Sequence, residues 1–76
     1  MDDGAYKKFR ELLVGVRKAA GLTQAELSQK LSRPQSFVSK YERGERRLDV
    51  IEFGEVAKAL NVDPAKLLDT FYRETQ

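Results

Sequence analysis

Polar side chains that can exchange hydrogen bonds with a partner cluster between residues 35 and 43. At about 100° per residue of α-helix, they fall within an arc of about 140°: Gln35, Ser36, Ser39, Lys40 and Arg43. Phe37, Val38 and Tyr41 occupy the other side of the same helix. This helix therefore buries an apolar stripe and offers amides, hydroxyls and cations to its surroundings, where they suit either a polar ligand or plain solvation.

The charge of the chain is distributed unevenly. The formal net charge is only +2, but the segment from Lys30 to Arg47 carries six basic and two acidic side chains. The segment from Leu48 to Gln76 has a net charge of −3. The central segment is therefore electropositive, as a surface that contacts phosphate groups should be. A solvated basic surface is the alternative interpretation.

The residue types that usually carry catalysis or bind metals are missing. The chain has no histidine and no cysteine, and it lacks the phosphate-loop, nucleophile-elbow and zinc signatures. Its aspartates and glutamates are scattered as helix caps and surface charges. The sequence therefore predicts no catalytic residue, no cofactor and no metal site.

Helical periodicity and capping residues divide the chain into five helices. Apolar residues recur at helical spacing until Gly21, which ends the first helix. Thr23 with Glu26 has the form of a capping box for a second helix over about residues 24–31. The third helix is expected over about residues 34–43, because a proline suits the first helical turn.

The remaining helices follow the same rules. Asp49 with Glu52 caps a fourth helix, which ends near Asn61, and Asp63 before a proline starts a fifth. We expect one domain over residues 1–76, with frayed ends at residues 1–4 and 73–76. No apolar stretch is long enough to span a membrane and no signal peptide is evident, so a soluble cytoplasmic protein is predicted.

Two segments of the chain carry a resemblance to a known family. The run from Gly21 to Leu27 and the run from Phe37 to Gly44 resemble the phage-repressor-like helix-turn-helix family, the Cro/CI or XRE type. The similarity continues over residues 56–62 and so covers nearly the whole chain. It implies a compact, all-α, five-helix domain of the lambda-repressor type, with the motif at about residues 23–44.

The resemblance also implies roles for individual residues. Carried over by position, the side chains that face base edges in the major groove are Gln35, Ser36, Ser39 and Lys40. The side chains that hold DNA phosphates are Gln24, Arg43, Arg46 and Arg47. Arg17 and Glu42 align with a partly buried salt bridge between the first and third helices. Ser32 departs from the glycine common in the inter-helix turn, and Pro34 stands near the third helix's N-cap.

The family implies a transcriptional regulator of bacterial or phage type. We expect a repressor that binds a palindromic operator in double-stranded DNA as a homodimer. A variant with the same fold is an antitoxin or a controller of a restriction system, and a different class is a protein-interaction module that does not read DNA. The sequence names no toxin or polymerase partner.

The dimer seam is expected on the last helix. Leu67, Leu68, Phe71 and Tyr72 place large apolar side chains on consecutive turns, and a small domain has little spare core to cover them all. We predict that part of this stripe, Leu68, Phe71 and Tyr72, meets its own copy across a two-fold axis. The alternative is that the stripe folds back entirely onto the core.

Overall fold

The structure, a computed structural model, describes residues 3–75. These residues form five α-helices and no strand: α1 (Asp3–Ala19), α2 (Gln24–Lys30), α3 (Ser36–Glu42), α4 (Val50–Ala59) and α5 (Pro64–Glu74). The all-α, five-helix fold predicted from the sequence is confirmed. None of the helices in residues 3–75 is both long and apolar enough to cross a membrane.

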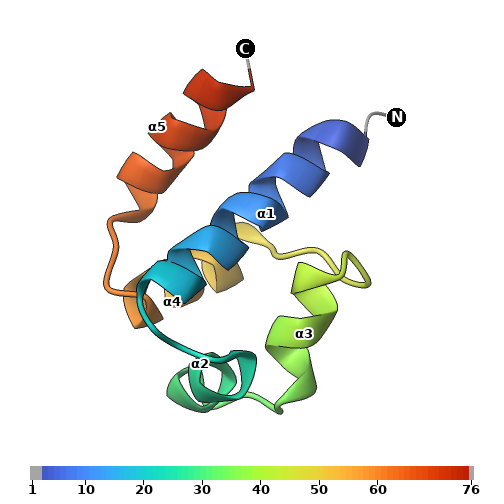
Figure 1. Ribbon diagram of the computed structural model, residues 1–76, viewed down its shortest axis with the longest axis vertical. Coiled ribbons are helices and arrows are strands. Elements are labelled where there is room, and N and C mark those ends of the chain that lie inside the picture. The colour runs from blue at the N-terminus through green and yellow to red at the C-terminus, as the bar shows by residue number, and fades with distance from the viewer. Residues whose placement is uncertain (1–2, 76) are drawn as a thin grey trace.

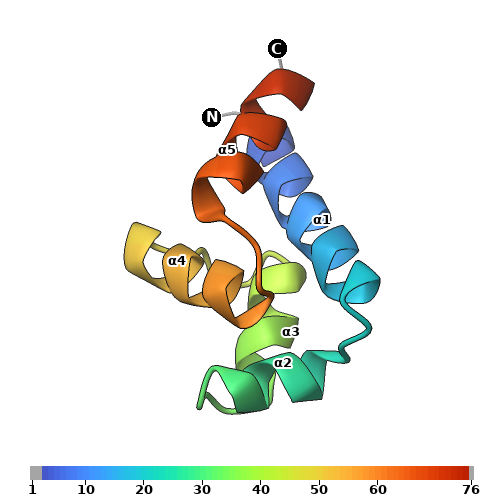
Figure 2. The same ribbon diagram turned by 90° about the vertical axis from the view of Figure 1, so that its left-hand side faces the viewer.

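The long helix α1 organises the arrangement of the others (Figure 1). Helices α3 and α5 both pack against α1, while α2 packs against α3 and α4 packs against α5. Figure 2 shows α2 and α3 together at one end of the molecule and the two chain ends at the other. The two halves of the predicted motif are therefore neighbours in space as well as in sequence.

Four helices send a fully buried apolar side chain into one core. Leu13 of α1, Leu27 of α2, Val38 of α3 and Val56 of α4 have no exposed surface, and Leu67 of α5 is 8% exposed. Burying a side chain of this size stabilises the fold by about 1.5–3 kcal/mol. Because Val38 lies in this core, the opposite face of α3 must point outward.

The predicted caps are present at the start of three helices. In α2 the amide of Glu26 donates to Thr23 Oγ1 (3.0 Å), and the amide of Thr23 donates to the Glu26 carboxylate (2.8 Å). The same reciprocal pair joins Asp49 and Glu52 before α4. The Asp63 carboxylate accepts from the second residue of α5. These bonds satisfy amides that the first turn of a helix leaves without partners.

The first four helices end in the same way, on a residue with a positive φ angle. Those residues are Gly21 (75°), Ser32 (55°), Gly44 (80°) and Asn61 (60°). In each case the next amide donates to the carbonyl five residues earlier, at 2.9–3.2 Å, which defines a Schellman motif. Serine in this conformation costs about 1 kcal/mol relative to glycine, and the turn after α2 nevertheless forms on Ser32.

The third helix is shorter than predicted. It begins at Ser36 rather than at Pro34 and ends at Glu42 rather than at Arg43. The Pro34 carbonyl instead accepts from the amide three residues on (2.9 Å), in a tight turn that precedes the helix. The left-handed Ser32 reverses the chain only two residues before Pro34, so this residue still belongs to the turn.

Helical structure also reaches further toward both chain ends than expected. The helix α1 starts at Asp3, and the nearby Tyr6 hydroxyl accepts from the amide of Leu48 (2.9 Å), which ties the start of α1 to the loop after α3. The helix α5 runs to Glu74, where the ion pair between Arg73 and Asp69 (2.9 Å) spans its last turn. The rest of the predicted frayed ends, residues 1, 2 and 76, lie outside the described residues.

Candidate nucleic-acid interface

The structure brings the four predicted base-reading residues together on one side of the motif's second helix. Gln35, Ser36 and Lys40 are exposed, and Ser39 is half-buried, with its hydroxyl donating to the Ser36 carbonyl (3.1 Å). Directly behind this face, the side chains of α3 that point inward are buried: Phe37, Val38 and Tyr41. The helix therefore presents amide, hydroxyl and ammonium groups from a rigid, packed base.

The start of α3 is held by a side chain from α2. Gln35 is the N-cap of α3 but its side chain makes no capping hydrogen bond. The buried Ser28 hydroxyl takes that place, because it donates to the Gln35 carbonyl (3.2 Å) and accepts from the amide of Val38 (3.4 Å). Ser28 therefore sets the position of α3 relative to α2. Sequence reasoning missed it, since a serine next to Leu27 carries no distinguishing signal.

A buried ionic network joins the first three helices. The guanidinium of Arg17 donates to both oxygens of the Glu42 carboxylate (2.8 and 3.1 Å) and to the carbonyl of Leu22 (2.8 Å). The side chains of Arg17 and Glu42 are only 10% and 5% exposed. The hydrogen bond to Glu42 raises the pKa of Arg17, so the guanidinium stays charged.

Gln24, predicted to touch a phosphate, is a member of this network. Its side-chain amide donates to the Glu42 carboxylate (2.8 Å), which links the start of α2 to α3. The amide oxygen of Gln24 takes no part in that bond. The family resemblance predicted the Arg17 and Glu42 pair but gave no sign that Gln24 would join it.

Arg46, also predicted to hold a phosphate, packs against the protein. Its guanidinium lies over the ring of Phe37 (4.9 Å to the centroid) and donates to the Glu52 carboxylate (2.9 Å). Arg33 lies over the same ring (4.7 Å) and within 3.7 Å of Glu52. The hydrogen bonds from Arg46 and from the amide of Asp49 lower the pKa of Glu52.

Arg43 and Arg47, the other two predicted phosphate contacts, lie together near the C-terminal end of α3. Arg43 donates to the Glu45 carboxylate (2.7 Å), both side chains are more than half exposed, and the bond lowers the pKa of Glu45. The guanidinium of Arg47 lies 4.2 Å from the ring centroid of Tyr6. The four predicted phosphate ligands therefore occupy three separate places around α3.

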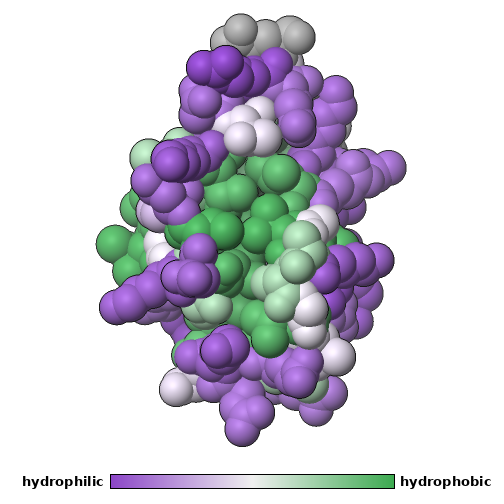
Figure 3. Space-filling view, turned by 60° about the vertical axis from the view of Figure 1, so that its left-hand side comes forward, coloured by the Kyte–Doolittle hydropathy of each residue, from purple (hydrophilic) through white to green (hydrophobic). Residues whose placement is uncertain are grey.

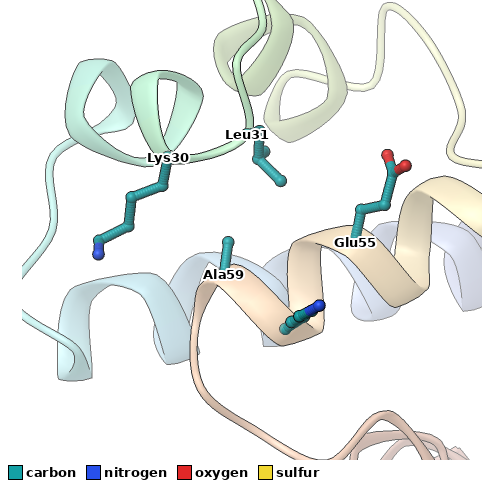
Figure 4. A pocket seen from close by; sticks show the side chains of 5 residues that line it. Lys30, Leu31, Glu55 and Ala59 are labelled. Atoms are coloured by element: carbon teal, nitrogen blue, oxygen red, sulfur yellow. The ribbon is translucent and has the colours of Figure 1, made fainter.

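A wide hollow lies between the end of α2 and the outer side of α4 (Figure 4). Lys30 and Leu31 reach toward it from α2, and Glu55 and Ala59 point into it from α4. Its wall combines charges of both signs with the apolar side chains of Leu31 and Ala59.

A family model described as Helix-turn-helix matches residues 16–67, which include all of α2, α3 and α4. The chain belongs to the XRE-type helix-turn-helix family. It is an XRE-type DNA-binding regulator, and α2 and α3, the helices predicted to form its motif, both lie within the matched residues.

Solved structures of similar proteins support this assignment. An XRE-family-like protein from Pseudomonas syringae pv. tomato is 47% identical, with a TM-score of 0.91, over 97% of this chain and 90% of that one. The restriction-modification controller protein C.AhdI from Aeromonas hydrophila is 32% identical, with a TM-score of 0.75, over 82% and 94% of the two chains. The controller protein C.Esp1396I, 22% identical over 97% of both chains with a TM-score of 0.86, shares the fold. No curated protein matches this helix-turn-helix chain.

Proposed function

We propose that this protein is a sequence-specific transcriptional regulator whose helix α3 enters the major groove of DNA. The observation that carries the proposal is the outward face of α3, where exposed Gln35, Ser36 and Lys40 surround half-buried Ser39. Glutamine can pair with adenine through two hydrogen bonds, lysine can donate to guanine O6 and N7, and serine can serve any base. These four side chains are the proposed base contacts.

The proposed phosphate contacts are Gln24, Arg43, Arg46 and Arg47. Phosphate contacts fix the register of a protein on DNA without reading sequence. The exposed pair of Arg43 and Glu45 is screened by solvent and contributes little stability, so Arg43 can exchange the carboxylate for a phosphate. Arg46 has a partly buried carboxylate partner in Glu52, and its contact with DNA is supported only by its place in the basic loop.

A homodimer on a palindromic operator completes the proposal. A seven-residue helix touches few base pairs, and two copies spaced about 34 Å apart double the sequence that is read. Leu68, Phe71 and Tyr72 of α5 remain the proposed seam. A dimer that covers a promoter represses transcription by excluding polymerase.

Selection of bound sequences from random DNA duplexes tests the proposal directly. We expect a palindrome whose half-sites are centred about one helical turn apart. Gln35→Ala and Lys40→Ala should each weaken binding to it by about 1–3 kcal/mol and relax the preference at particular positions. Lys66→Ala, an exposed charge on α5, is the matched control. Enrichment of no sequence by the wild type would refute specific reading and favour the protein-interaction module.

A second candidate function is control of a restriction-modification system. The 32% identity with the controller C.AhdI favours it over the antitoxin alternative. The selected palindrome should then occur upstream of adjacent endonuclease and methyltransferase genes. A small toxin gene in their place would favour the antitoxin instead.

A further inference from the structure

A hollow of about 270 Å³ lies at the edge of the helix-turn-helix motif, between the first turns of α1 and the loop after α3. The residues that line it are Tyr6, Arg10, Arg43, Gly44 and Arg47. Figure 1 shows how α1 passes beside this loop, and the bond between Tyr6 and Leu48 fastens the two segments. The described residues of the hollow therefore gather three guanidinium groups and a phenol.

The guanidinium of Arg10 lies directly on the backbone of Gly44. A Cβ atom at Gly44 would lie 2.9 Å from Cζ and 3.0 Å from Nη1 of Arg10, so a larger residue there would displace the guanidinium from this place. The side chain of Arg10 is half-buried, and within residues 3–75 it forms neither an ion pair nor a hydrogen bond. A partly desolvated cation without an anionic partner is unfavourable, and an anion that enters the hollow relieves this cost.

Tyr6 is positioned to add a neutral donor to the same hollow. Its hydroxyl oxygen accepts from the amide of Leu48 (2.9 Å), while its ring lies against the guanidinium of Arg47 (4.2 Å). The hydroxyl hydrogen is given to no acceptor within the described residues. The side chains that line the hollow thus supply donors from several directions, which is what an oxyanion such as phosphate requires.

The hollow continues the DNA-reading face of α3. Arg43 connects the two, because it is the exposed C-cap of α3 and also lines the hollow. We propose that Arg10 and Tyr6 of α1, together with Arg43 and Arg47, bind one backbone phosphate of the duplex just beyond the groove that α3 occupies. This inference rests on the proposed function, and it assigns a DNA contact to a helix outside the motif.

The salt dependence of DNA binding tests the inference. Each neutralised phosphate contributes a slope of about −0.9 to the logarithm of affinity against the logarithm of salt concentration. Arg10→Gln should make this negative slope less steep by about one unit per protomer. It should also weaken binding to every duplex, by about tenfold at 0.1 M salt. Lys66→Gln, with the same loss of charge on α5, should leave the slope unchanged. Arg10→Lys keeps the charge and should keep the wild-type slope.

Two further measurements make each outcome decisive. In the wild type, the Nε–H resonance of Arg10 should shift when a duplex is added, while that of Arg73 on α5 should not, and this measurement needs no variant to fold. If folded Arg10→Gln keeps the wild-type slope, or if the Arg10 resonance does not shift, Arg10 does not bind a DNA phosphate. Either result would overturn the inference without affecting the proposal that the protein binds DNA through α3. A further outcome is that inorganic phosphate raises the melting temperature of the wild type but not that of Arg10→Gln, while the salt dependence of DNA binding is the same for both. The hollow would then bind free phosphate, and the proposed DNA contact would be overturned. A wild type that binds no duplex would overturn the proposed function together with this inference.

Discussion

Among the described residues, Glu42 is the carboxylate that ties α1, α2 and α3 together. It accepts hydrogen bonds from Arg17 and from Gln24 and is almost fully buried. Removing one partner of a buried pair leaves the other charge without compensation, which costs more than the pair itself contributes. The pair is therefore a structural element of the interface, and α3 depends on it for its orientation.

We predict that Glu42→Ala lowers the free energy of unfolding by about 3–5 kcal/mol. The double change with Arg17→Met should cost less than the single one, because no unpaired guanidinium then remains in the interior. Urea unfolding of the complete double-mutant cycle measures the coupling energy. The exposed pair of Arg73 and Asp69 is the matched control, with an expected coupling below about 0.5 kcal/mol. Additive losses for Arg17 and Glu42 would contradict a buried pair.

Glu52 gives a prediction about pH. Hydrogen bonds from Arg46 and from the amide of Asp49 lower its pKa from the ordinary value of 4.5. The stability that the charged carboxylate contributes is therefore complete above that value and is lost as the pH falls through the lower native pKa.

Glu52→Gln should lower the free energy of unfolding by about 1 kcal/mol at neutral pH, since the amide can still accept from Asp49 but no longer neutralises Arg46. Between roughly pH 5 and pH 3, the variant should lose less stability than the wild type does. Urea midpoints at several pH values measure both effects, and Glu55→Gln on the exposed side of α4 is the control. If the stability of the wild type and of Glu52→Gln falls in parallel as the pH is lowered, Glu52 does not contribute to the pH dependence of stability.

At the scale of elements, α3 cannot form by itself. It has seven residues and no side-chain cap of its own, and isolated helices this short are unstable in water. Its start is satisfied by Ser28 of α2, and its end by the left-handed Gly44. The reading helix therefore exists only as part of the two-helix unit.

We expect Ser28→Ala to destabilise the protein by about 1–3 kcal/mol, because it leaves the amide of Val38 and the carbonyl of Gln35 without this partner. DNA binding should weaken as well, since the angle between α2 and α3 is no longer fixed. Ser36→Ala, on the exposed face, should change the stability by less than about 0.5 kcal/mol. Equal melting temperatures for wild type and Ser28→Ala would show that the buried hydroxyl does not hold the unit together.

At the scale of the whole molecule, one face of the protein carries a patch of apolar side chains. Figure 3 shows apolar side chains gathered on the side where α4 and α5 come forward, surrounded by polar ones. The predicted stripe on α5 is partly covered. Leu68 packs against the core, and the ring of Phe71 packs against the ring of Phe9, with 5.4 Å between the ring centroids. Tyr72 remains 58% exposed. Val50 and Ile51 on α4, at 76% and 69%, are a second exposed pair that the sequence pattern did not single out.

We predict that the protein self-associates through the face that contains Tyr72. Sedimentation at micromolar and higher concentrations should show a dimer, and a palindromic duplex should bind two copies even where the free dimer is weak. Tyr72→Ala should weaken association without loss of stability, because the ring is already exposed. Ile51→Ala tests the second pair separately. A monomer that also binds the duplex one copy at a time would rule the dimer out.

The sequence by itself determined the number of helices, the caps of α2, α4 and α5, the turns at Gly21 and Asn61, and the two faces of α3. These features depend on neighbours three to five residues apart and on the φ angles that each residue tolerates, so local reasoning reached them. The buried pair of Arg17 and Glu42 came from the family resemblance. Only the tertiary structure decided that Ser28 caps α3 and that Arg46 turns to Phe37 and Glu52. It also decided that Arg10 lies on Gly44, because a side chain's partner across the fold depends on how the helices pack.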